Sequence, residues 1–153
     1  MNNRGMTLIE ILVVLGLFTI IGSFALPVSL SMVRDSSYHA DRASLIAALQ
    51  HARAESVDDA CAGSSCNAGA PHGVSIQPHT YVIFQGPHYA SRDAVQDEVI
   101  DANPSVGHGG VSEIIFAPSS GDVAAPGEIV LTDASGHAST ITVGSEGEII
   151  WSN

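Results

Sequence analysis

The sequence contains no lysine, and its five basic residues, all arginine, face 16 aspartates and glutamates, giving a formal net charge of −11. So acidic a chain repels the phosphate backbone, which argues against nucleic-acid binding by this chain alone. Aromatic residues make up only 5% of the sequence, so few side chains are present on which bases could stack.

Cysteine is almost absent as well, since Cys61 and Cys66 are the only two. Two cysteines and one nearby histidine, His72, do not match a recognised zinc pattern. Outside the cytoplasm a disulfide persists, and closing so short a loop should contribute roughly 2 kcal/mol to stability. We therefore predict a structural disulfide, and a metal site or a redox pair remains the alternative.

The sequence also lacks a catalytic constellation, since neither a Gly-x-Ser-x-Gly element nor a phosphate-binding loop occurs in it. His51 and Glu55 stand four residues apart, a spacing more typical of a surface contact on a helix. Asp122 and Asp133 lie near glycines without the spacing of an EF-hand, which favours ordinary turns. We expect a non-enzymatic protein without a cofactor or a metal ion.

What the chain does have is a long uncharged run from Ile11 to Val33. A helix of this length extends about 35 Å, slightly more than the ~30 Å hydrocarbon layer of a membrane. Arg4 precedes the run, so the positive-inside rule keeps the N-terminus in the cytoplasm. The run therefore predicts one membrane-spanning helix.

Glu10 is unusual, because a carboxylate inside a spanning helix costs ~2.5 kcal/mol or more near the membrane centre. In one interpretation Glu10 lies near one end of the helix and reaches the head groups. In the other it pairs with a cation. Cleavage between Gly5 and Met6 would create such a cation, an α-amino group on Met6 with a pKa of about 8. Pairing between neighbouring molecules would then explain assembly.

Gly5, the segment Met6–Glu10 and the long apolar helix together resemble the leader of type IV pilins and type II secretion pseudopilins. The resemblance implies cleavage after Gly5 by prepilin peptidase, methylation of the Met6 amine and guidance of subunits into a filament by Glu10. Family members more often have phenylalanine at the position of Met6, a mild departure because methionine is also apolar. The implied partners are other pilin or pseudopilin subunits, prepilin peptidase, an inner-membrane assembly platform and membrane lipid.

Pro27 lies inside the apolar run, where it removes its own N–H and leaves the carbonyl of Ser23 without a partner, at a cost of ~3 kcal/mol. We predict a helix kink there, and the resemblance implies the same, because pilin helices often bend at such a proline. The alternative for the whole stretch is an ordinary secretory signal cleaved after Ala25. Glu10 argues against this alternative, since an acidic residue has no use in the core of such a signal.

Past Val33 the pattern changes twice. Apolar residues at three- and four-residue steps predict a helix from about Ser37 to Val57, whose other face carries Asp41 and four more polar residues. From Gly73 onward, short alternating runs separated by turns predict antiparallel strands paired as consecutive hairpins, while Gly86 to Gly110 is expected to be mostly an irregular loop. The expected strands are Val74–Ile76, Tyr81–Phe84, one around Val99, Glu113–Ala117, Glu128–Thr132, Ser139–Val143 and Glu148–Trp151.

These patterns predict an α+β fold in which a long membrane-spanning helix continues into a small pilin-like domain of antiparallel β-sheet. The expected divisions are a leader peptide at 1–5, an assembly helix at 6–33 and an extracytoplasmic domain at 34–153. Ala52–Val57 and the strand order are similar to the GspH/FimT group of minor pseudopilins. Glu148 stands where that group often has a basic residue, so no ligand-binding role is carried over.

The leading hypothesis is a minor structural subunit of a type II secretion pseudopilus or a type IV pilus. It would be a single-pass protein of the bacterial inner membrane with a periplasmic C-terminal domain. The alternative is a filament-tip module that binds a secreted protein or a surface ligand. The sequence leaves open whether the system serves secretion, a pilus or DNA uptake.

Overall fold

The computed structural model describes residues 7–63 and 69–153, and it leaves out the side chains of 24–35. The chain forms two compact units, Met1–Ser37 and Tyr38–Asn153. One long helix precedes strands that pair antiparallel in every case. The predicted α+β class with antiparallel sheet is therefore confirmed.

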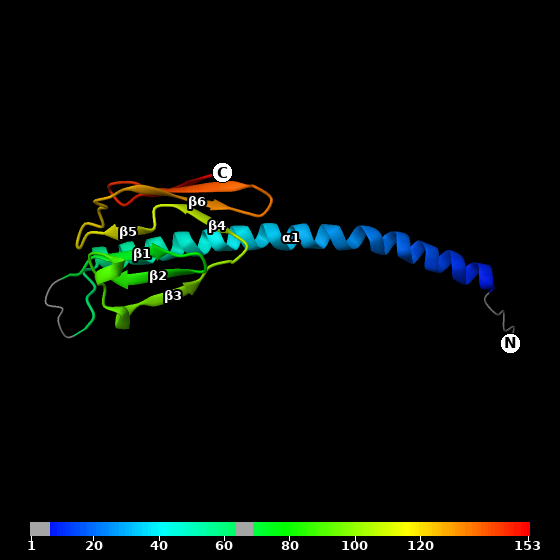
Figure 1. The fold of residues 1–153 in the computed structure, drawn as a ribbon, viewed down its shortest axis with the longest axis horizontal. Coiled ribbons are helices and arrows are strands. Elements are labelled where there is room, and N and C mark those ends of the chain that lie inside the picture. Colours follow the sequence, from blue (N-terminus) through cyan, green and yellow to red (C-terminus); the bar gives the residue numbers. More distant parts are fainter. Residues whose placement is uncertain (1–6, 64–68) are drawn as a thin grey trace. The chain divides into compact units, whose positions relative to one another are not determined.

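The helix α1 runs from Leu8 to Val57 (Figure 1). At its start, the backbone N–H of Glu10 donates to the hydroxyl of Thr7, 3.4 Å away, as at a helix N-cap. At its end, Asp59 adopts a positive φ of 52°, the left-handed conformation that commonly stops a helix. The helix predicted from Ser37 to Val57 is confirmed as the C-terminal part of α1.

Two predictions about the N-terminal half of α1, the membrane span and the kink at Pro27, stay predictions. Within the described residues, no helical stretch is both long and apolar enough to cross a membrane. The kink predicted at Pro27 falls among the residues whose side chains are not described.

Two four-stranded sheets make up the rest of the second unit (Figure 1). The first has the order β3-β2-β1-β5 and contains β1 (His72–Ile76), β2 (Thr80–Gln85), β3 (Glu98–Asp101) and β5 (Glu113–Phe116). The second has the order β4-β6-β7-β8 and contains β4 (Gly107–Gly110), β6 (Gly127–Thr132), β7 (Ala138–Val143) and β8 (Ile149–Ser152). Between β2 and β3 lie two short 3-10 turns, η1 (Tyr89–Ser91) and η2 (Ala94–Gln96).

The structure corrects the sequence prediction in two places. The stretch Gly86–Gly110, expected to be mostly irregular, contains β4, which was missed because three of its four residues are glycine, a residue depleted in strands. The segment Glu113–Phe116 pairs with β1 rather than with the next strand along the chain. The strands therefore divide into two sheets instead of forming one run of hairpins.

The core of the second unit lies where α1 meets both sheets. Leu45, Leu49 and Ala52 on α1 are completely buried, and in β7 buried residues alternate with partly exposed ones, as expected for a sheet with one covered face. The buried Ser56 hydroxyl ties the end of α1 to the first sheet. It donates to the carbonyl of Phe116 at 3.0 Å and accepts from the His72 N–H at 2.9 Å.

We predict that Leu49→Ala lowers the free energy of unfolding of the second unit by about 2–5 kcal/mol, because it empties a fully buried site. Urea unfolding of the full chain in detergent, followed by Trp151 fluorescence, measures the change. Val95→Ala is the matched control, since Val95 is 86% exposed, and it should change stability by less than about 0.5 kcal/mol. Equal effects of both variants would contradict the assignment of this core.

Candidate functional site

The N-terminal part of α1 carries apolar side chains on every face. Ile11–Leu15 alone go once around the helix, because successive residues are about 100° apart. The large hydrophobic side chains of this part are exposed to extents between 42% at Val14 and 78% at Leu8. A helix that is apolar all round normally lies inside a larger assembly or in lipid. This surface is therefore built to be covered by something other than its own domain.

Glu10 is the single charged residue between Leu8 and Ser23, and its side chain is exposed in the first turn of α1. A carboxylate is favoured there, because the N-terminal end of a helix carries a partial positive charge. The predicted cleavage residues Gly5 and Met6 lie outside the described residues, so their roles stay predictions.

The predicted disulfide has one end in the described part of the chain. Cys61 is not a free thiol, whereas Cys66 lies outside the described residues, so their pairing stays a prediction. The neighbouring Ala62 is bound to the Gln85 side chain on β2 through bonds of 2.8 and 3.0 Å. The described residues contain no group of three or more histidines, cysteines or acids placed to hold a metal ion.

A cluster that the sequence did not predict joins α1 to both sheets. Tyr81 on β2 donates its hydroxyl hydrogen to Asp41 Oδ2 on α1 at 2.8 Å. Nε2 of His108, on β4, lies 2.6 Å from the Tyr81 oxygen and 3.2 Å from Asp41 Oδ2. The other carboxylate oxygen, Oδ1, accepts from the backbone N–H of Asn103 at 2.7 Å. One buried carboxylate therefore holds three separate elements together.

The protonation states follow from this network. Burial raises the pKa of Asp41, but hydrogen bonds from His108, Asn103 and Tyr81 outweigh it, so the pKa of Asp41 lies below its usual value. Burial, and then the Asp41 carboxylate, raise the pKa of Tyr81 far above its usual range. Asp41 is therefore ionised while Tyr81 keeps its proton, and we assign a hydrogen to Nε2 of His108, because this atom faces the two oxygens.

The second ring nitrogen of His108, Nδ1, takes no part in this network. The atom is buried and has no hydrogen-bond partner among the described residues, and the His108 side chain is only 5% exposed. An unpaired buried polar atom costs about 1–3 kcal/mol.

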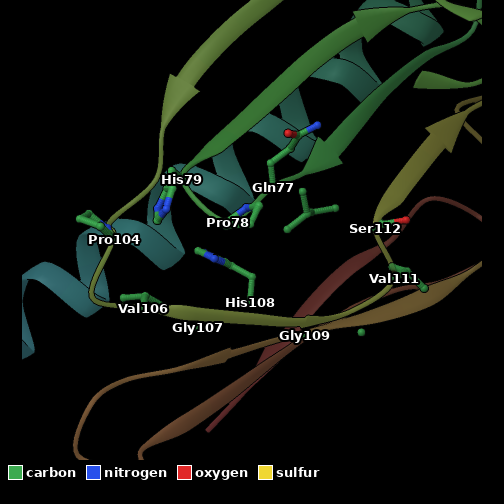
Figure 2. A pocket seen from close by; sticks show the side chains of 12 residues that line it. Gln77, Pro78, His79, Pro104, Val106, Gly107, His108, Gly109, Val111 and Ser112 are labelled. Carbon is green, nitrogen blue, oxygen red and sulfur yellow. The ribbon is translucent and has the colours of Figure 1, made fainter. Parts of the chain in front are cut away.

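His108 lines a pocket of about 410 Å³ between β4 and the turn that joins β1 to β2. Gln77, Pro78 and His79 form the wall on the side of the turn, and Val106 and the glycines of β4 form the other. Figure 2 shows the imidazoles of His79 and His108 extending into the space between these two walls. The volume lies within the range of pockets that hold ligands or side chains.

The helical spacing of the sequence indicated one member of this cluster, Asp41. Asp41 stands three residues after Tyr38 and four before Leu45, so it belongs to the buried stripe of α1 rather than to the polar face expected for it. A carboxylate at such a position needs buried partners. The sequence could not predict the partners of Asp41, because Tyr81 and His108 lie on strands that are distant along the chain.

The comparisons with known proteins agree with the N-terminal geometry. Residues 1–26 match the family model of the prokaryotic N-terminal methylation motif. The resemblance drawn from Gly5 to Glu10 is thereby confirmed: the chain carries the N-terminal motif of type IV pilin-like proteins, a class that prepilin peptidase processes and whose members assemble with other pilin subunits. Neither the curated proteins nor the solved structures gave a match. The finer GspH/FimT assignment rests on resemblance alone.

Because the pKa of Asp41 is lowered, ionised Asp41 stabilises the folded state above its usual pKa of 3.8, and this stability is lost as the pH falls through the lower folded pKa. We expect Asp41→Asn to be about 1–3 kcal/mol less stable at pH 7, and the gap to the wild type to narrow below pH 4. Urea unfolding between pH 7 and 2.5 measures both. The exposed Asp58→Asn is the control, and a gap that does not depend on pH would contradict the ionised cluster.

Proposed function

We propose that this protein is a minor structural subunit of a type II secretion pseudopilus or a type IV pilus, similar to the GspH/FimT group. Its helix from Met6 to Val33 would hold it in the inner membrane with residues 34–153 in the periplasm. The observation that carries the proposal is the exposed apolar surface of α1, in which Glu10 is the single charged residue between Leu8 and Ser23. A surface of this kind is suited to lipid before assembly and to the helical bundle of a filament after assembly.

Proteolytic processing would supply the positive charge that Glu10 needs as a partner. Cleavage between Gly5 and Met6 creates the Met6 α-amino group, which methylation leaves basic and therefore able to pair with Glu10. In a low-dielectric bundle, a carboxylate without a partner is costly, so a subunit out of register would be rejected. Pairing between the Met6 amine of one subunit and Glu10 of its neighbour would thus set the axial position of each subunit.

The second unit fits exposure to an oxidising compartment. A disulfide between Cys61 and Cys66 would close the loop that follows α1, and the Ala62–Gln85 bonds hold one end of that loop against β2. The assembly platform and the peptidase would meet the membrane part of the chain. The sheets would remain available for contacts along the filament.

We predict that Glu10→Ala still inserts and is still cleaved after Gly5, but that its recovery in sheared filaments falls tenfold or more. Each ~1.4 kcal/mol of lost pairing corresponds to one factor of ten. Immunoblots of the membrane and filament fractions measure both steps. Glu128→Gln, an exposed carboxylate on β6, is the control and should assemble like the wild type. Normal incorporation of Glu10→Ala would refute the charge pairing.

A further inference from the structure

The second sheet has two open edges. Its order is β4-β6-β7-β8, so β4 and β8 each have a neighbour on one side only among the described strands. Such an edge presents a row of unpaired N–H and C=O groups. Natural proteins usually protect an edge with charged residues or proline, yet Gly-His-Gly-Gly in β4 and Ile-Ile-Trp-Ser in β8 contain neither. Both edges are therefore competent to pair with another chain.

The directions of the two edges match each other. Each neighbouring pair in this sheet is antiparallel, so three reversals separate β4 from β8, and the two run in opposite directions. When two copies stand side by side in the same orientation, β8 of one copy is therefore antiparallel to β4 of the next. Adjoining copies in a polar filament share their orientation, so two neighbouring copies satisfy this requirement.

The hydrogen-bonding groups match as well. Val111 N–H donates to Glu128 at 3.0 Å, so by the alternation of an antiparallel ladder the backbone groups of His108 point to the open edge of β4. Gly144 N–H donates to Glu148 at 3.0 Å, which in the same way points the groups of Trp151 to the open edge of β8. Placing His108 opposite Trp151 makes the two strands, of four residues each, overlap over their full length.

The side chains of the two edges are complementary in size. Ile150 and Trp151 are 62% and 48% exposed on β8, whereas β4 offers glycine at three of its four positions. Trp151 pairs with the buried Ile141, and His108 pairs with the buried Leu131, so both side chains point to the inner face of the sheet. An indole placed beside His108 would lie at the pocket between β4 and Pro78, whose lining residues Figure 2 shows.

The Trp151 ring is already held in position. The guanidinium of Arg42 lies 4.1 Å from the ring centre and donates to the Asn153 side chain at 2.6 Å. A preorganised aromatic side chain loses little conformational freedom on binding, which favours it as an anchor.

We propose that β8 of one copy pairs with β4 of the next copy in the filament, in the register Gly107↔Ser152, His108↔Trp151 and Gly109↔Ile150, with the Trp151 indole in the pocket of its neighbour. The inference rests on the proposed function and requires at least two adjoining copies. The chain itself provides a strand of the right length, direction and side-chain size. This favours a second copy over an exported peptide as the occupant.

Cysteine cross-linking of the full chain in cells tests the register. Gly109 and Ile150 would lie side by side on the outer face, and a Cβ at Gly109 would meet only the Val130 carbonyl at 3.9 Å. Copies with Gly109→Cys and copies with Ile150→Cys, carrying different tags, are produced together and oxidised. We expect a mixed disulfide dimer in the filament fraction at least tenfold above that of Gly109→Cys with Val95→Cys, an exposed site on η2.

A dimer no more abundant than in this control pair, in filaments that contain the chain, would overturn the inference and leave the proposed function intact. A cross-link from Gly109→Cys to a different protein would also overturn it. Absence of the wild-type chain from filaments would instead overturn the proposed function together with the inference.

Ile150→Lys tests the pairing without cysteines, because a lysine on an edge strand opposes the addition of another strand. Its recovery in filaments should fall about tenfold, while Val95→Lys should match the wild type. Equal recovery of the two variants would overturn the pairing.

Discussion

A helix with no polar face is unstable in water, and this constraint governs the N-terminal part of α1. The large apolar side chains from Leu8 to Ile21 are exposed on all sides, and Glu10 is the single charge among them. Burying this surface against lipid or other helices is favourable, at roughly 25 cal/mol per Å². Burying Glu10 is not, unless a cation meets it. The N-terminal methylation motif at residues 1–26 fits a chain whose processing creates such a cation.

The second half of α1 solves the same problem inside its own domain. There the apolar residues form a stripe that both sheets cover, and Asp41 within that stripe receives hydrogen bonds from Tyr81, His108 and Asn103. The Asp41 carboxylate thus finds its hydrogen-bond partners within the chain. The Glu10 carboxylate has to find its partner in another molecule. The second unit shows the same contrast. Its core is packed by its own residues, whereas among the described strands the edges of β4 and β8 are open to another chain.

Local patterns predicted much of this arrangement. The three- and four-residue spacing after Ser37 gave the end of α1, and alternation gave the hairpin of β1 and β2 and the short strand around Val99. Pairing between distant strands was not predictable, because β5 looks equally suited to pair with β1 or with β6. The Asp41–Tyr81–His108 cluster was missed for the same reason. Its members are distant in sequence, and glycines around His108 hid its strand.

The mass of the native polypeptide, purified from filaments, tests the central claim most directly. The account predicts a chain that begins at Met6 and is one methyl group heavier than the unmodified sequence from that residue. A chain that begins at Leu26 would show an ordinary secretory signal. A filament chain that still begins at Met1 would contradict the account, because Glu10 would then have no amine created by cleavage to pair with.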